Sequence, residues 1–176
     1  MSSILRINVA VLGGLEAGKT TLLNTFVSDG VRGNKQYLMT IHPEVHVKRI
    51  KVPDTTTTVE LFLFDCPGYP GSNEVTKRAI AECAMVLFMY SANDRETYDT
   101  LKEWVDFFQE ATMAGHPDGV VVETNAQEPD NVVLPHEGPE LAKSLGLPFA
   151  RANALTDLNV DVPFSMLAFM AHDRAK

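Results

Sequence analysis

The sequence predicts one α/β domain over residues 1–176, with a mostly parallel sheet that helices cover on both faces. Three observations support this fold class. Apolar, strand-like runs alternate with amphipathic segments along the chain. A phosphate-binding loop pattern joins the first apolar run to the first helical segment. Polar residues follow several predicted strands, at the edge where open α/β sheets bind ligands.

The spacing of apolar residues places the individual elements. The run 44–52 alternates polar and apolar residues, which is typical of an edge strand with one solvated face. The run 59–64 is nearly all apolar, and a turn over 53–56 lets these two runs form a hairpin. Strands are predicted over 5–12, 44–52, 59–64, 84–90, 119–122 and 148–151. Helices are predicted over 19–28, 74–82, 96–112, 136–145 and 161–171, with Pro163 tolerated in the first turn of the last one.

The segment from Gly13 to Thr20 has the pattern G-x-x-x-x-G-K-[ST]. Its glycines allow backbone N–H groups to turn around a phosphate, and the following helix directs the positive end of its dipole to the same place. The ammonium of Lys19 can reach the outer phosphates, and the hydroxyl of Thr20 can bind Mg²⁺. A glycine-rich turn that binds nothing is the alternative, but all the positions of the pattern and both flanking elements favour the phosphate site.

Composition excludes several classes of protein. The chain has 176 residues, 45% of them hydrophobic, and a net charge of −8 from 23 acidic and 15 basic residues. It has no Lys/Arg run, so we expect neither nucleic acid nor an anionic membrane as a partner. Its two cysteines suggest no disulfide framework. The sequence shows no signal peptide, no bilayer-spanning run and no lipidation motif, so we expect no direct membrane anchor and a cytoplasmic environment.

Further polar residues follow the later strands. Asp65 and Gly68 come after the run 59–64, and this arrangement suits a carboxylate that holds Mg²⁺ through water and a backbone N–H directed at a terminal phosphate. Thr40 can bind Mg²⁺ when a γ-phosphate is present. Taken alone, each is more often an ordinary loop residue; together with the phosphate-binding loop they favour a nucleotide site. Five histidines show no metal-ligand spacing, so a zinc site is not expected.

The order and spacing of these motifs resemble the nucleotide motifs of the Ras superfamily, nearest the Rab branch and, within it, the Rab-like GTPases of intraflagellar transport. The resemblance implies a P-loop NTPase fold with a six-stranded sheet, which binds GTP or GDP with Mg²⁺. It also implies a small β-sandwich partner, intraflagellar transport protein 25, membership of the intraflagellar transport B complex, and work in cilia or flagella. Carried over residue by residue, it implies nucleotide contacts from Gly13, Leu15, Glu16, Ala17, Gly18, Lys19, Thr20, Thr21, Thr40, Gly68, Asn125, Glu128, Asn153 and Ala154, and metal contacts from Thr20, Thr40 and Asp65.

Two departures from the family pattern bear on hydrolysis. Tyr69 stands where Ras-like proteins have the glutamine that orients the attacking water, so no catalytic residue is assigned. Leu15 fills a loop position that is usually small, and its bulk would crowd the γ-phosphate. No arginine is obviously placed to act in cis. We therefore predict very slow or absent intrinsic GTP hydrolysis.

The base-reading motif also departs from the family pattern Asn-Lys-x-Asp, because the chain has Asn125, Ala126, Gln127 and Glu128 there. Glu128 keeps a carboxylate but adds a methylene, and Ala126 lacks the aliphatic stem that covers a base. Gly33 stands near the usual aromatic stacking position. We expect weaker contacts to the base, and a preference for guanine is implied by the resemblance alone.

Two rival interpretations remain at this point. In the first, the chain is a structural subunit whose nucleotide pocket has decayed, and it holds a β-sandwich partner with or without nucleotide. In the second, it is a P-loop ATPase or small-molecule kinase. The sequence after residue 65 offers no substrate-binding lid, which disfavours the second interpretation.

Overall fold

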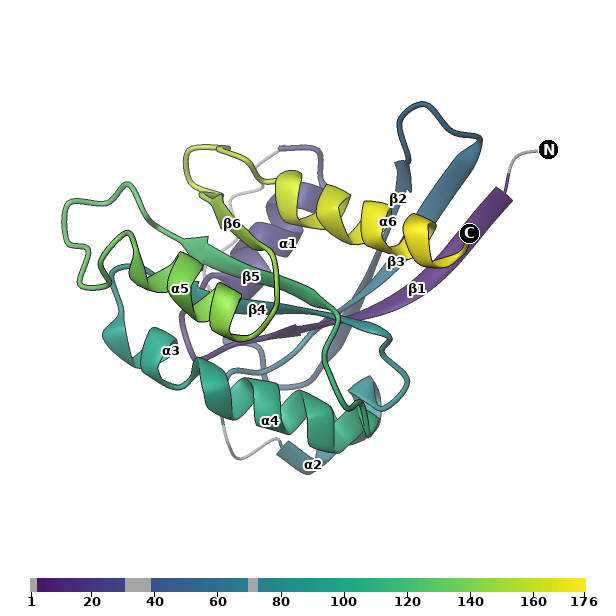
Figure 1. The fold of residues 1–176 in the computed structure, drawn as a ribbon. Coiled ribbons are helices and arrows are strands. Elements are labelled where there is room, and N and C mark those ends of the chain that lie inside the picture. The colour runs from purple at the N-terminus through teal and green to yellow at the C-terminus, as the bar shows by residue number, and fades with distance from the viewer. Residues whose placement is uncertain (1–2, 31–38, 70–72) are drawn as a thin grey trace.

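A computed structural model describes residues 3–30, 39–69 and 73–176. These residues form a six-stranded sheet with the order β2-β3-β1-β4-β5-β6 (Figure 1). Only the β2–β3 pair is antiparallel; the other four pairs run parallel. The strands are β1 (Ser3–Leu12), β2 (Glu44–Lys51), β3 (Thr57–Asp65), β4 (Met85–Ser91), β5 (Gly119–Thr124) and β6 (Phe149–Ala152). The predicted mostly parallel sheet and the 44–64 hairpin are therefore confirmed.

Burial differs between the central strands and the edge strand β2. Every residue of β4 and of β5 is buried, as expected for central strands with a helix layer on each side. Exposed residues alternate with half-buried ones along most of β2, which lies at the end of the sheet. Successive side chains of a strand point to opposite faces, and α1 packs against this strand. The half-buried positions are His46, Lys48 and Ile50, whereas Val45 and Val47 are exposed. The predicted edge strand is confirmed, but these two apolar residues lie on its solvated face.

Helices cover the sheet on both faces, as predicted (Figure 1). On one face α1 (Lys19–Val27) and α6 (Val162–Arg174) share a core with the strands, and Phe26 stacks on Phe164 with ring centroids 3.8 Å apart. On the other face α2 (Asn73–Ile80), α4 (Leu101–Thr112) and α5 (Glu137–Ser144) pack over a second core. None of the helices in the described parts of the chain is long and apolar enough to cross a bilayer.

The prediction of one continuous helix over 96–112 is wrong. The segment forms two helices, α3 (Arg95–Asp99) and α4, which meet at Thr100. The Thr100 hydroxyl donates to the Glu96 carbonyl at 2.8 Å, a side-chain bond of the kind that bends helices. The break lets α3 run beside the end of β4, where Thr97 is buried and its hydroxyl accepts the Ser91 N–H at 2.9 Å.

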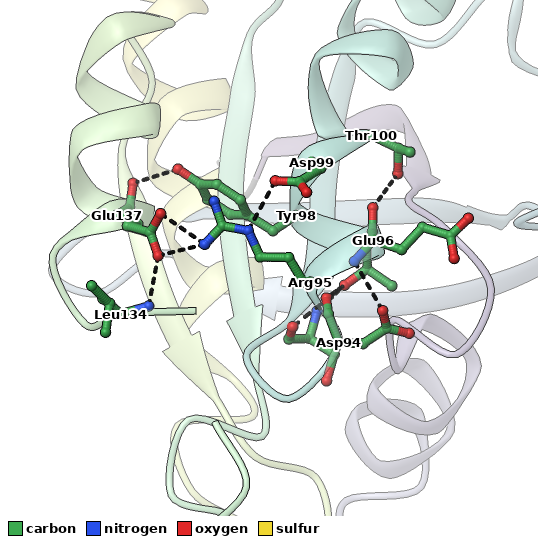
Figure 2. Close-up of polar contacts among 10 residues, drawn as sticks. Asp94, Arg95, Glu96, Tyr98, Asp99, Thr100, Leu134 and Glu137 are labelled. Carbon is green, nitrogen blue, oxygen red and sulfur yellow. Dashed lines mark hydrogen bonds and ion pairs between the residues drawn. The ribbon is translucent and has the colours of Figure 1, made fainter. Parts of the chain in front are cut away.

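Figure 2 shows how α3 is fastened to α5. Both carboxylate oxygens of Glu137 accept from the Arg95 guanidinium at 2.8 Å, and the Leu134 N–H donates to the same carboxylate. The Tyr98 hydroxyl donates to the Glu137 carbonyl at 3.1 Å, and Arg95 also pairs with Asp99. These contacts fix the segments that follow β4 and β5, and both segments border the ligand edge of the sheet.

Three charged residues lie side by side across one end of the sheet. Register places Arg6 of β1 and Arg49 of β2 on either side of Glu60 of β3. The Glu60 carboxylate accepts from both guanidinium groups, at 3.0 and 2.7 Å. Hydrogen bonding by Arg49 is the main cause that lowers the pKa of Glu60 below its ordinary value. The ionised carboxylate is therefore favoured in the folded chain.

We expect Glu60→Gln to lower the midpoint of thermal unfolding at pH 7, measured by circular dichroism. A lowered folded-state pKa contributes stability above the unfolded pKa, and this contribution is lost as the pH falls through the folded value. The deficit of the variant should therefore shrink below about pH 4.5. Glu82→Gln, at an exposed position without an ion pair in the described residues, is the control. A deficit that stays constant from pH 7 to pH 3 would contradict the prediction.

Candidate functional site

The loop between β1 and α1 is held by close backbone approach. A Cβ on Gly13 would lie 2.2 Å from the Met89 carbonyl oxygen of β4, and one on Gly68 would lie 2.5 Å from the Gly14 carbonyl carbon. Neither position can hold a side chain unless the backbone moves. The segment after β3 is thereby brought against the loop.

The start of α1 adds to an anion-binding geometry. Gly18 is the N-cap residue, in the left-handed region at φ 88°, and has no side chain to cap the first turn. The N–H groups there are available to an anion, which the helix dipole also favours. The Thr124 hydroxyl of β5 donates to the Ala17 carbonyl at 2.8 Å, so the loop is also tied to the second central strand.

Lys19 is 7% exposed, and its ammonium lies against the loop itself. The Nζ atom donates to the carbonyl oxygens of Gly13 and Gly14, both at 2.8 Å. Burial lowers the pKa of Lys19 to about 8, although the nearby Asp65 carboxylate favours the charged form. A buried cation whose environment disfavours its charge gains from an anionic ligand.

The three predicted metal-binding residues meet at the start of α1. The Thr20 hydroxyl donates to Asp65 Oδ2 at 2.6 Å, and the Thr20 and Thr40 hydroxyl oxygens are 2.8 Å apart. Asp65 is fully buried, and burial raises the pKa of its carboxyl group. Within the described ranges, Asp65 Oδ1 has no hydrogen-bond partner. Two hydroxyls and a carboxylate are hard oxygen donors, so the set fits Mg²⁺.

Two adjoining cavities lie along the loop. The first is lined by Leu15, Glu16, Ala17, Gly18, Lys19, Thr20, Thr21, Met39, Thr40, Cys66 and Gly68. The second has a volume of about 240 Å³ and is lined by Glu16, Gly18, Thr21, Leu22, Thr124, Asn125, Ala154 and Leu155. The first cavity contains the groups predicted to bind phosphate, whereas the second combines an amide, a carboxylate and two threonines with apolar side chains. Together they fit a polar chain joined to a flat ring system.

Asn125 is held in one orientation. It lies in the left-handed region at φ 59°, which asparagine tolerates better than most residues. Its side-chain amide donates to Ser91 Oγ at 2.8 Å, and that hydroxyl donates to Asn93. This bond uses one of the two N–H groups of the amide, so the second N–H and the side-chain oxygen can still contact a ligand.

Two other residues that the sequence associates with the base line neither cavity. Glu128 is not among the residues that line either cavity; its backbone N–H closes a turn onto the Asn125 carbonyl at 3.0 Å. Asn153 is buried, and its Oδ1 accepts from the N–H groups of Leu155 and Thr156, so it shapes the loop that presents Ala154. Gly33 lies outside the described residues.

Residues 8–172 match the Ras family. The chain belongs to this family. Among its relatives, the intraflagellar transport protein 27 homolog of Trypanosoma brucei brucei is 27% identical over 93% of this chain and 88% of its own length. The homolog of Mus musculus is 27% identical over 89% of this chain and 84% of its own length. Rab-26 of Mus musculus is 28% identical over 91% of this chain and 60% of its own length.

Ras-family membership implies a guanine-nucleotide site, usually with Mg²⁺, at this edge of the sheet. Sequence reasoning missed part of its lining, namely Met39, Cys66, Leu22, Thr124 and Leu155. Most of these are apolar residues that a sequence assigns to the core. All five carried one usable signal, because each directly adjoins a predicted site residue in the sequence.

We expect Thr20→Val to destabilise the ligand-free chain by about 1–3 kcal/mol, because it leaves the buried Asp65 carboxylate without its donor. Urea unfolding in the absence of Mg²⁺ and nucleotide measures this cost. Thr20→Ser keeps the hydroxyl and is the matched control, expected close to the wild type. Equal stability of the Val and Ser variants would show that the contact contributes nothing.

Proposed function

We propose that the chain is a Rab-like subunit that binds GTP and GDP and acts in intraflagellar transport, with very slow or absent intrinsic hydrolysis. The observation that carries the proposal is the meeting of Lys19, Thr20, Thr40 and Asp65 beside one cavity, with Asn125 in the next. The first cavity has groups suited to a polyphosphate, and the second has groups suited to a base attached to it.

In this proposal each group has one role. Lys19 and the loop N–H groups hold the phosphates, while Thr20, Thr40 and the Asp65 carboxylate hold Mg²⁺, which supplies charge neutralisation for the phosphates. Gly68 lies against the loop and provides a backbone N–H for the terminal phosphate. Asn125 and the backbone near Ala154 contact the base. Contacts that differ between GTP and GDP then order or release the segments around Thr40 and Gly68.

Slow hydrolysis follows from position 69. A phenol cannot orient a water as a glutamine amide does, and an orienting glutamine with an arginine finger is worth several powers of ten in rate. Leu15 also lines the phosphate cavity and is 43% exposed there. The chain therefore works as a binding switch whose state changes by exchange of nucleotide rather than by its own catalysis.

The transport role rests on the relatives. Two proteins with the name intraflagellar transport protein 27 homolog align with most of this chain. By extension, we propose that the chain joins the intraflagellar transport B complex in cilia or flagella and in the cytoplasm. Its direct partner there is the β-sandwich subunit, intraflagellar transport protein 25.

We expect purified protein to release GDP or GTP on denaturation, at close to one nucleotide per chain by chromatography. Chelation of Mg²⁺ with EDTA should accelerate nucleotide release by at least about tenfold, because the phosphate charge is no longer neutralised. Lys19→Ala should lose the nucleotide during purification. An empty wild-type protein that binds neither GTP nor GDP at millimolar concentration would refute nucleotide binding.

Single-turnover hydrolysis of bound GTP should be slower than about 10⁻⁴ s⁻¹ in the wild type. Tyr69→Gln should raise the rate by about tenfold or more, because the amide restores a group that can orient water. Tyr69→Phe is the control for loss of the phenol alone and should leave the rate unchanged. Equal rates in the Gln and Phe variants would show that position 69 does not limit hydrolysis.

One observation favours the alternative function, a structural subunit whose nucleotide pocket has decayed: Glu128 does not line the cavity beside Asn125. In that case the chain holds its β-sandwich partner independently of nucleotide. Titration of the partner against the GTP-bound, GDP-bound and emptied chain distinguishes the two functions. Three equal affinities would favour the structural subunit, and a preference for one nucleotide state would favour the switch.

A further inference from the structure

Glu16 stands in an unusual place for an acidic residue. It lies in the loop between β1 and α1, is exposed, and lines both cavities of the site. Its backbone is in the left-handed region at φ 60°, which non-glycine residues adopt only under strain. The chain therefore keeps a carboxylate at a position where glycine would fit the backbone better.

The charge balance of the site makes this carboxylate important. Of the residues that line the two cavities in the described chain, only Lys19 and Glu16 are charged under neutral conditions. The Lys19 ammonium is engaged by the carbonyls of Gly13 and Gly14. Within residues 3–30, 39–69 and 73–176, no basic side chain forms an ion pair with Glu16. The negative charge of Glu16 thus opposes the one lysine that attracts phosphate.

We propose that Glu16 limits the affinity of the site for nucleotide, so that the chain releases its nucleotide faster than the phosphate-binding loop alone would allow. This inference rests on the proposed function. Because Glu16 borders both cavities, its charge lies nearest the phosphates next to the base, which GDP and GTP share. The effect is therefore similar for the two nucleotides, whereas Leu15 lines only the phosphate cavity.

The charge and the backbone strain of Glu16 can be separated by two variants. Glu16→Gln removes the charge and keeps the strained backbone, whereas Glu16→Gly removes both. Asp54 offers a matched control, because it is also exposed and left-handed, at φ 56°, but lies in the β2–β3 turn and lines neither cavity. Asp54→Asn and Asp54→Gly repeat the two changes away from the site.

The experiment uses the full chain freed of nucleotide, with fluorescently labelled GDP and GTP titrated at low and at high ionic strength. Removal of one nearby charge should tighten binding by about three- to tenfold at low salt and slow dissociation by a similar factor. We expect this in both Glu16 variants and for both nucleotides, with a smaller change at high salt because salt screens exposed charges. Only the two glycine variants should raise the melting temperature, and neither Asp54 variant should change affinity.

The possible results separate this inference from the proposed function. If the wild type binds GDP and Glu16→Gln binds it equally or more weakly, the role of Glu16 is wrong and nucleotide binding stands. If the Asp54 variants tighten binding as much as the Glu16 variants, the effect is one of net charge, and the local role is again wrong. If neither the wild type nor any Glu16 variant binds nucleotide, both proposals fall.

Discussion

The site depends on a buried ammonium group that the folded chain holds at a cost. Lys19 is buried, and in the described structure its ammonium donates to two loop carbonyls, which use two of its three N–H donors without neutralising its charge. Burial lowers the pKa of Lys19 to about 8, because the charged form is less favourable away from water. An anion placed beside the loop would offset this unfavourable burial of charge. In the proposed function, this arrangement favours phosphate before a ligand arrives, since the same packing that buries the lysine also directs the start of α1 at the site.

The sheet makes that packing possible. The loop leaves β1 between β3 and β4, so the segments that follow these strands approach it from both sides. Where they touch, backbone meets backbone: Gly13 lies against Met89, and Gly68 lies against Gly14. The Thr20–Asp65 hydrogen bond then joins α1 to the end of β3, and the Thr20–Thr40 contact brings in a third segment. A change in occupancy can therefore affect three separate segments, because all three meet at the Thr20 hydroxyl.

Most of the fold could be predicted from the sequence because its signals are local. The nearly all-apolar run of β4, the alternation along β2 and the phosphate-loop pattern each predict one element, and the parallel order follows from the alternation of strands with helices. The break at Thr100 could not be predicted in this way. The apolar spacing continues through it, and the break depends on Thr97 being buried beside Ser91, a contact between elements. The two cores, one on each face, likewise follow from apolar residues on both sides of the central strands.

The predicted phosphate and metal residues lie together in the structure, whereas the residues predicted on the base side lie together only in part. Glycines, a lysine and hard oxygen ligands are restricted by what they must do, so a pattern identifies them. A base can be covered by any apolar surface, and Leu22 and Leu155 carry no such signature. Conversely, a residue can occupy a motif position without lining the cavity, as Glu128 does. In the proposed function, contacts to the phosphates and to the base therefore come from different parts of the chain. The first part is fixed by close packing, and the second depends on how the loops after β5 and β6 are held. The Asn125–Ser91 contact and the Asn153 turn hold those loops without using the carboxylate that the family pattern places there.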